Sequence, residues 1–146
     1  MWAILSEPGT LEMLTCQAAE ITEGNCLAKL GLLDDPTARI FAIEAEGVLV
    51  GMEALAHIDW QNKSAVIPCI AITRHGNQYG LSATRALVRH AFDTLGLHRV
   101  SYTSIHPDAL KRARALGARF EGTEVAAIWK DGKWHNRNRF AFLKEG

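Results

Sequence analysis

Apolar and polar positions alternate along the chain with two spacings, one typical of strands and one typical of helices. Residues 2–5 are predicted to form a short strand, and Pro8 fits the first turn of a helix that follows. A second short helix is expected over residues 26–33. Residues 40–43 and 48–58 are strand-like and flank the turn signal Glu46-Gly47, so they predict an antiparallel pair.

The middle of the chain carries its longest apolar run. Residues 65–73 are apolar almost throughout, which is typical of a strand buried on both faces. Pro68 lies inside this run and has no N–H to donate, so we expect a bulge or a break in the pairing there. A helix follows Gly80, and Gly96 is predicted to cap its end. Its apolar stripe consists of Thr84, Leu87, Val88, Ala91 and Leu95.

The last third of the chain predicts a strand, a short helix and a hairpin. Residues 98–105 are strand-like, and Pro107 begins a helix that Gly117 ends. Residues 120–129 and 134–143 are predicted to pair around an Asp-Gly turn. The element order is β-α-α-β-β-β-α-β-α-β-β, which indicates an α/β (α+β) domain with a mixed sheet.

Composition limits the classes of protein to consider. The chain has 146 residues, 48% of them apolar and 22% charged, as expected for one globular domain over residues 1–146. No apolar run reaches the roughly 18 residues of a membrane span, and the N-terminus does not resemble a signal peptide. The three cysteines show no metal-type spacing. We therefore expect a cytoplasmic protein with free thiols.

The formal net charge of zero hides an uneven distribution. Residues 1–73 contain three basic and ten acidic side chains, a net charge of −7, and residues 74–146 contain 13 basic and six acidic ones, a net charge of +7. A basic half can attract a polyanion, such as a nucleotide-containing cofactor or a nucleic acid. It can equally complement the acidic half within the fold or in a dimer.

The segment 74–80 has the character of a phosphate-binding loop. It is polar, contains Gly76 and Gly80, and joins a predicted strand to a predicted helix, whose first N–H groups would point at an anion. Arg74 adds a positive charge. The order of residues excludes a P-loop, and the lack of three spaced glycines after a first strand excludes a Rossmann fingerprint. An ordinary strand-to-helix turn is the alternative.

Four segments together resemble the GCN5-related N-acetyltransferases (GNAT), and especially the branch that acetylates the N-termini of ribosomal proteins. They are residues 57–65, residues 76–100 with their glycine loop and helix, His106-Pro107-Asp108, and residues 116–135. The resemblance implies a mostly antiparallel central sheet whose central strands splay apart around acetyl-CoA. It also implies contacts of the pantetheine arm with the main chain near Ile70, Ala71 and Ile72. The pyrophosphate would lie on the loop and the helix start, which are Arg74, His75, Gly76, Asn77, Gln78, Tyr79, Gly80 and Leu81.

The chain departs from the family pattern at several positions. The family loop reads Arg/Gln-x-x-Gly-x-Gly/Ala, whereas this chain has His75 first and Gln78 at the middle glycine. Ala109 stands where the family usually has Asn, and the Tyr that can protonate the departing thiolate has no counterpart.

The function implied by the resemblance is transfer of acetyl from acetyl-CoA to a primary amine, of a small molecule or a protein N-terminus. The alternative is a catalytically impaired GNAT-fold module that binds acyl-CoA or another partner.

Two residues are candidates for the chemistry. Glu53 shares strand parity with Leu55 and His57, so an inward-facing carboxylate is predicted as the base; the alternative is a solvated edge position. His106, at a strand end, is a candidate proton donor, although a His before Pro more often caps the next helix. We expect His57 to lie exposed near a turn, and Cys69 to be a small buried side chain.

No metal is expected, because the histidines and cysteines show no ligand spacing. The basic residues argue against nucleic-acid binding, because they fall on separate elements without an aromatic stacking platform. They are Arg85, Arg89, Arg99, Lys111, Arg112, Arg114 and Arg119. A homodimer is predicted, with Trp129, Trp134 and Phe142 exposed for the contact.

Overall fold

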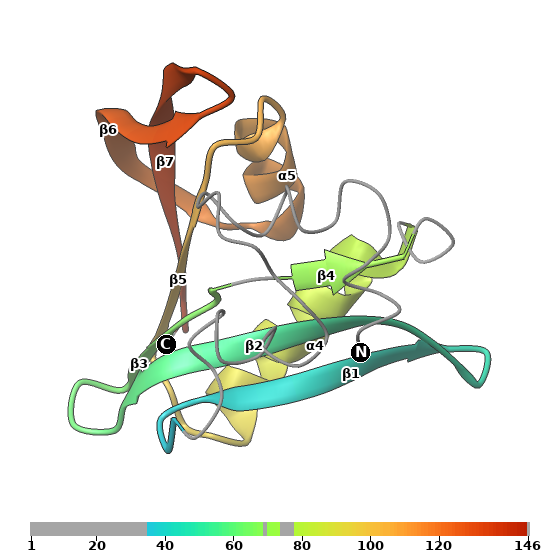
Figure 1. Ribbon diagram of the computed structural model, residues 1–146. Helices are drawn as coiled ribbons and strands as arrows, with labels where there is room; N and C mark the ends of the chain where they lie inside the picture. Colours follow the sequence, from blue (N-terminus) through green and yellow to red (C-terminus); the bar gives the residue numbers. More distant parts are fainter. Residues whose placement is uncertain (1–34, 69, 74–77, 146) are drawn as a thin grey trace.

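The structure is a computed structural model that describes residues 35–68, 70–73 and 78–145. The described part consists of seven strands and two helices (Figure 1). The strands are β1 (Arg39–Ala45), β2 (Val48–Asp59), β3 (Ser64–Val66), β4 (Ile70–Ile72), β5 (Arg99–Ser104), β6 (Arg119–Lys130) and β7 (Lys133–Leu143), and the helices are α4 (Gly80–Asp93) and α5 (Ala109–Leu116). The strand predicted at residues 2–5 and the helices predicted from Pro8 and over residues 26–33 lie outside the described residues.

One mixed sheet contains all seven strands. Its order is β1-β2-β3-β5-β7-β6, and β4 pairs with β2 beyond the end of β3. Only β3 and β5 run parallel, and the other pairs are antiparallel. The predicted fold class, a mixed and mostly antiparallel sheet, is confirmed.

The sheet divides in its centre. The contact between β3 and β5 ends at Ile67, whose N–H donates to the carbonyl of Ser101 at 2.8 Å. Beyond it, β4 pairs with β2 only, while β5 continues along β7 as far as Ser104. Figure 1 shows β4 and β5 diverging from this point. The predicted splay of the central strands is therefore present in the fold.

The break lies at the predicted proline. Pro68 belongs to no strand and is exposed, because a residue without an N–H cannot continue the ladder. The expectation that residues 65–73 form one continuous strand was wrong, since they contribute to two strands, β3 and β4. Within it Ala65 and Ile67 are buried, whereas Ile70 and Ile72 are only half-buried.

Both described helices cover the same face of the sheet. Phe142 of β7 packs in a cluster with Leu87 and Val88 of α4. Phe140, two residues earlier on the same strand and therefore on the same face, packs against Ala109 and Ala113 of α5. Two clusters of core side chains thus lie between this face and the two helices.

The ends of the elements follow the turn signals with one correction. Gly117 ends α5 in the left-handed conformation, at φ 79°, as predicted. Asp131 and Gly132 also have positive φ and form the two-residue turn between β6 and β7. The predicted cap of α4 at Gly96 was wrong: the helix ends at Asp93 with Thr94 as its C-cap, and Gly96 adopts φ 69° in the turn that follows.

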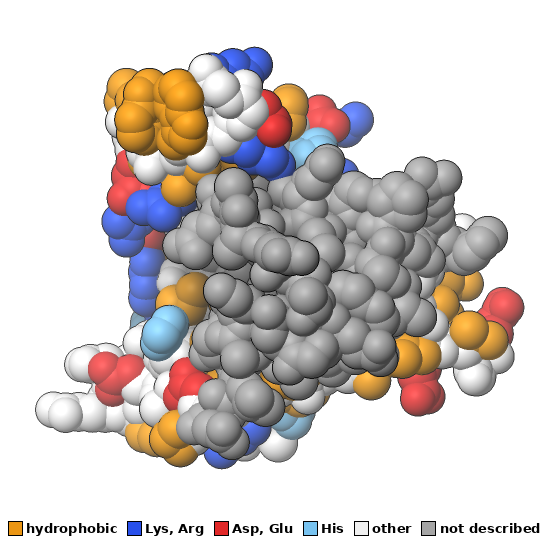
Figure 2. Space-filling view, in the orientation of Figure 1, with side chains coloured by type: hydrophobic (Ala, Val, Ile, Leu, Met, Phe, Trp, Pro, Cys, Tyr) orange, Lys and Arg blue, Asp and Glu red, His pale blue; other side chains and the backbone are white. Residues whose placement is uncertain are grey.

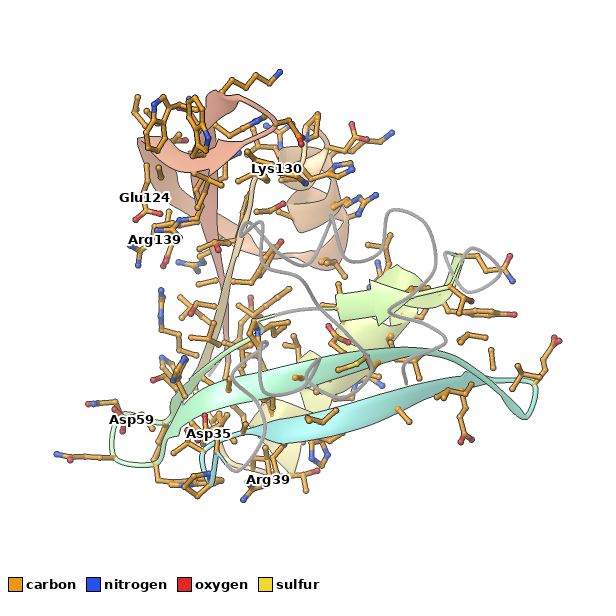
Figure 3. The ribbon with its side chains drawn as sticks, in the orientation of Figure 1. Asp35, Arg39, Asp59, Glu124, Lys130 and Arg139 are labelled. Carbon is orange, nitrogen blue, oxygen red and sulfur yellow. The ribbon has the colours of Figure 1, made fainter. Side chains whose placement is uncertain are left out.

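The β6–β7 hairpin carries an ionic cluster on one side. Glu124 of β6 pairs with Arg137 at 2.5 Å and with Arg139 at 3.6 Å, both on β7. Figure 3 shows Glu124 and Arg139 close together on the hairpin. Cross-strand pairs of opposite charge support the register of an antiparallel hairpin, so this cluster helps to hold the long strands together.

Candidate functional site

The divided sheet brings the predicted cofactor residues to the start of α4. Ile70, Ala71 and Ile72 form β4, Gln78 and Tyr79 form a short 3₁₀ turn, and Gly80 and Leu81 open the helix. Four predicted residues, Arg74, His75, Gly76 and Asn77, lie outside the described residues. The described members of the set are thus adjacent to one another, at the end of β4 and beside the divergence from β5.

The first turn of α4 has the chemistry of an anion site. Its N-cap residue, Tyr79, makes no side-chain capping bond, and no acidic residue lies in the first turn. The first N–H groups of a helix have no intrahelical partner, and the helix dipole adds positive potential there. A phosphate at this position would receive both contributions.

Gly80 is required for space and not for an unusual backbone conformation. A Cβ at this position would stand 3.0 Å from Cδ1 of Ile72, tighter than ordinary van der Waals contact. Its φ is not in the left-handed region, so the backbone conformation at this position does not require glycine. The glycine instead lets the helix start lie directly against β4.

Strand β4 offers a backbone edge beside the divergence. One edge pairs with β2, through Gly51, Met52 and Glu53. Within residues 35–68, 70–73 and 78–145, no strand pairs with the other edge. Backbone N–H and C=O groups need partners, so this edge suits an extended ligand that carries amides.

Glu53 is buried in the centre of the sheet. Its side chain is 2% exposed, and it is the only buried charged residue in the described part of the chain. Oγ1 of Thr84, on α4, donates to Oε1 of Glu53 at 2.8 Å. Burial raises the pKa of the Glu53 carboxyl to about 7, and the Thr84 hydrogen bond acts in the opposite direction.

The predicted inward orientation of Glu53 is confirmed, and the alternative of a solvated edge position was wrong. The carboxyl lies on the face that α4 covers, and it titrates near neutral pH, as a general base should. At 2% exposure it cannot touch an acceptor directly, so a role in proton transfer requires a water between them.

His57 does not share the surroundings of Glu53. The pairing of β2 with β3 shifts register between Ala56 and Asp59, and His57 within this bulge has φ 51° and is exposed. Its predicted exposure is confirmed. The expectation that it lies on the face of Glu53 was wrong, because a bulge breaks the alternation of strand faces.

His106 follows β5 and contacts the start of α5. Its backbone N–H donates to Oγ of Ser104 at 3.1 Å, and its Nδ1 accepts from the N–H of Asp108 at 3.1 Å. This bond closes the turn before α5 and binds the N–H of its N-cap residue, Asp108, so it is not a side-chain cap of the helix itself. Because Nδ1 acts as the acceptor, the proton of the neutral ring lies on Nε2, which is left able to donate.

Thr84 is the residue of this site that sequence reasoning did not single out. It appeared only as a member of the apolar stripe of α4. A hydroxyl within such a stripe, opposite a predicted inward-facing carboxylate, is the signal that could have identified it.

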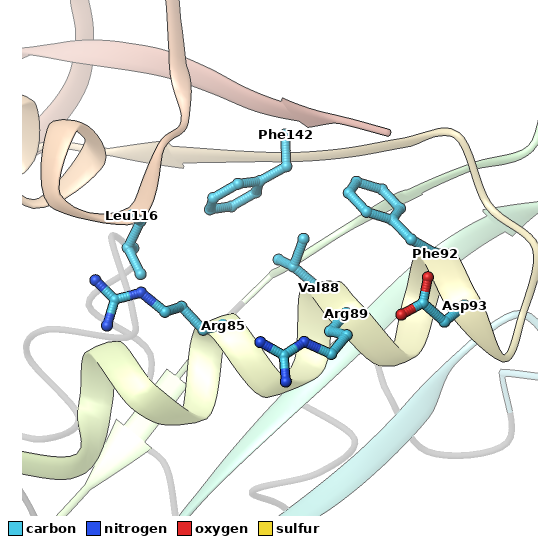
Figure 4. A pocket seen from close by; sticks show the side chains of 7 residues that line it. All are labelled: Arg85, Val88, Arg89, Phe92, Asp93, Leu116 and Phe142. Atoms are coloured by element: carbon cyan, nitrogen blue, oxygen red, sulfur yellow. The ribbon is translucent and has the colours of Figure 1, made fainter. Parts of the chain in front are cut away.

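A separate groove runs along the later turns of α4. Its walls come from α4, Leu116 and Phe142, it measures about 280 Å³, and Arg85 and Arg89 border it (Figure 4). The Arg85 guanidinium donates to the carbonyl of Ala115 at 2.7 Å, which ties α4 to α5. The groove is distinct from the first turn of α4, where the predicted cofactor residues lie.

Other sequence predictions meet different outcomes. Arg99 forms a two-bond ion pair with Glu121, at 2.7 and 2.5 Å, and so is committed to the fold. Cys69 lies outside the described residues. Among residues 35–68, 70–73 and 78–145, no group of three His, Cys, Asp or Glu side chains could hold a metal ion. No helix in the same ranges is long and apolar enough to cross a bilayer.

The exposure predicted for the residues of a dimer contact is confirmed for two of the three. Trp129 and Trp134 are 55% and 61% exposed, and their rings meet edge to face with centroids 5.2 Å apart. Figure 2 shows hydrophobic side chains gathered at the end of the β6–β7 hairpin. Phe142 is only 6% exposed, so its predicted exposure was wrong, because α4 covers that end of β7.

The mixed, mostly antiparallel sheet, divided between β4 and β5, is a GNAT-like fold. Solved structures with this fold match the chain. Spermidine N-acetyltransferase from Vibrio cholerae, in complex with CoA and spermine, matches with a TM-score of 0.80 at 19% identity, over 97% of this chain and 86% of that one.

Two further matches agree with this fold. A mutant of the same enzyme has a TM-score of 0.73 at 21% identity, over 86% of this chain and 76% of that one. A structure described as a probable acetyltransferase has a TM-score of 0.64 at 24% identity, over 75% and 63%. No protein-family model and no curated protein sequence matches the chain. The likeness shows the fold, and the ribosomal-protein branch stays a prediction.

Proposed function

We propose that the protein is an N-acetyltransferase that transfers acetyl from acetyl-CoA to a primary amine, on a small molecule or a protein N-terminus. The observation that carries the proposal is the division of the sheet, where β4 leaves the path of β5, with the uncapped start of α4 after β4. A related fold holds CoA and spermine, which supports both an acyl-CoA and an amine acceptor. The basic half of the chain favours an anionic cofactor.

The cofactor would bind along the start of α4 and β4. Its pyrophosphate would accept hydrogen bonds from the N–H groups of residues 76–81, which include Gln78 and Leu81, with Arg74 and His75 beside them. Its pantetheine amides would pair with the edge formed by Ile70, Ala71 and Ile72. This arrangement needs no metal.

Transfer requires a neutral amine, a polarised thioester carbonyl and a proton for the departing thiolate. We assign the first task to Glu53, whose pKa of about 7 suits a base at neutral pH. Since its carboxyl is 2% exposed, it would take the proton through a water. A backbone N–H of Ile70 or Ala71 would polarise the carbonyl. His106 would protonate the thiolate from Nε2, because its Nδ1 accepts from Asp108.

Calorimetry with CoA and acetyl-CoA tests the binding part of the proposal. We expect heat of binding for the wild type and at least about tenfold weaker binding for Gly80→Val, whose larger side chain would push the helix start away from Ile72. Ala86→Val is the matched control, because it adds a branched side chain to the exposed side of the same helix. A folded wild type that gives no heat at millimolar CoA would refute the proposal.

A thiol-release assay tests the reaction. The wild type should release CoA from acetyl-CoA in the presence of at least one acceptor from a panel of polyamines and N-terminal peptides. Glu53→Gln and His106→Gln should each slow turnover about a hundredfold with little change in the Kd for CoA. Tight CoA binding without turnover on any acceptor would instead favour the catalytically impaired acyl-CoA-binding module.

A further inference from the structure

A hydrogen bond joins the buried carboxylate to the cofactor helix. Thr84 on α4 and Glu53 on β2 are 31 residues apart in sequence, and their oxygen atoms are 2.8 Å apart. A carboxylate buried to this extent is costly unless hydrogen bonds compensate for the lost water. The simplest role for Thr84 is thus to satisfy Glu53, and any further role must be distinguished from it.

The position of Thr84 in the helix points to a further role. Gly80 and Thr84 are four residues apart and therefore lie on the same side of α4. Gly80 sits against Ile72 of β4, and Thr84 binds Glu53 of β2, so the first turns of the helix touch two neighbouring strands. Glu53 and Ile70 are partners in the register that joins those strands. The two contacts therefore hold the first turns of α4 against β4 at Ile72 and against β2 opposite Ile70, along the strand where the cofactor would lie.

The two kinds of contact constrain the helix differently. Farther along α4, Leu87, Val88 and Ala91 are buried in the core, and apolar packing tolerates small rotations and shifts. The hydrogen bond of Thr84 fixes a direction as well as a distance. The side chains that face Glu53 from its neighbouring strands, Phe41 of β1 and Ile70 of β4, are apolar and offer no such constraint.

We propose that Thr84 is a positioning residue for acyl-CoA binding: its hydrogen bond to Glu53 fixes where the first turns of α4 stand relative to the edge of β4. The inference rests on the proposed function, because it takes the start of α4 as the phosphate site. Phosphate binding by helix N–H groups depends on their aim, so a small rotation of the first turn weakens it.

The test compares single and paired variants of the full chain. Thr84→Val removes the hydroxyl at nearly constant volume, and Thr84→Ser keeps it. The pair Glu53→Met with Thr84→Val removes both polar groups, which restores a fully apolar contact and should fold even if Thr84→Val alone does not. Thr103→Val is the matched control, since Thr103 is an exposed residue of β5.

Calorimetry with CoA, and chemical unfolding of the same samples, separate the two roles. We expect about tenfold weaker CoA binding for the paired variant despite wild-type stability, and near wild-type binding for Thr84→Ser and Thr103→Val. A stable paired variant that binds CoA as the wild type does would overturn the inference, because Thr84 would then only satisfy the carboxylate. A wild type that binds no CoA would refute the proposed function, and the inference with it.

Discussion

The buried carboxyl of Glu53 should make the stability of the protein depend on pH in a way that one substitution removes. Burial raises its pKa from 4.5 to about 7 in the folded state. Between these two values the folded protein holds a proton that the unfolded chain has released. The favourable contribution of the protonated group is therefore complete below pH 4.5, and it is lost as the pH rises through 7.

The size of the effect follows from the difference between the two pKa values. Each unit corresponds to about 1.4 kcal/mol, so a shift from 4.5 to about 7 corresponds to about 3 kcal/mol. A single domain of this size is stabilised by about 5–15 kcal/mol, so the change is a large fraction of the total. Glu53→Gln should abolish it, because the amide does not titrate and its oxygen can still accept from Thr84.

Urea unfolding followed by circular dichroism, at intervals from pH 4.5 to pH 8, measures the effect. The free energy of unfolding of Glu53→Gln, relative to the wild type, should rise by about 3 kcal/mol across this range. Carboxyls with lowered pKa values, such as Glu121 beside Arg99, are present in both proteins and cancel in the difference. Glu44→Gln, which removes an exposed carboxyl on β1, is the control for the loss of one charge.

If the free energy of unfolding of Glu53→Gln relative to the wild type does not change with pH, the raised pKa of this carboxyl is refuted. Such a result would mean that the carboxyl does not titrate between pH 4.5 and pH 8, either because water reaches it or because further hydrogen bonds hold it ionised. The role proposed for Glu53 as a base would then lose its physical basis, since a carboxylate with an ordinary pKa is a weak acceptor of protons at neutral pH.

Three further predictions concern the fold and its surfaces. Phe140→Ala should lower the free energy of unfolding by about 3–5 kcal/mol, because Phe140 is fully buried, whereas Val125→Ala at a 78% exposed position should change it little; urea unfolding measures both. Gly117→Ala should cost about 1 kcal/mol, seen as a lower Tm, since the residue has φ 79°. Sedimentation at micromolar concentration should show a homodimer that replacing Trp129 and Trp134 by Ser dissociates; a monomeric wild type would contradict this expectation.

The strands and turns of the described region could be predicted because local chemistry determines them. Strand-like apolar segments on either side of Glu46-Gly47 predicted β1 and β2, and the Asp-Gly pair predicted the β6–β7 turn. Pro68 gave the break between β3 and β4, since its missing N–H acts at one position whatever surrounds it. The divergence of β4 from β5 beyond this break was implied by the family resemblance, whereas Pro68 by itself predicted only the break in pairing.

The exposure of a strand residue could not be predicted from local sequence where it depends on whether a helix packs over that residue. Trp134 and Phe142 have the same strand parity on β7, because an even number of residues separates them. Trp134 is 61% exposed and Phe142 is 6% exposed, because α4 packs over one end of the strand and not over the hairpin end. Strand alternation indicates which residues share a face, but it does not indicate how far a helix extends across it.

The candidate site likewise contains one feature that local sequence predicts and another that depends on tertiary packing. The inward position of Glu53 followed from parity along β2, whereas its partner Thr84 depends on how α4 is placed over the sheet. His57 was assigned to the face of Glu53 because the bulge that turns it outward leaves no mark in the alternation. Parity holds along an unbroken strand and fails at each register shift.

Glu53 is the point at which stability and function make opposite demands on this chain. A glutamine or an apolar residue there would avoid the loss of about 3 kcal/mol that the ionising carboxyl brings as the pH rises to neutral. A buried group that weakens the fold at neutral pH is a candidate for a functional role. This holds particularly for a group with a pKa near 7 on β2, the strand that pairs with β4 where the sheet divides. Its cost appears in the unfolding measurements, and its benefit would appear only in CoA binding and turnover. The two sets of experiments can therefore disagree, and that disagreement would separate a functional carboxylate from a structural one.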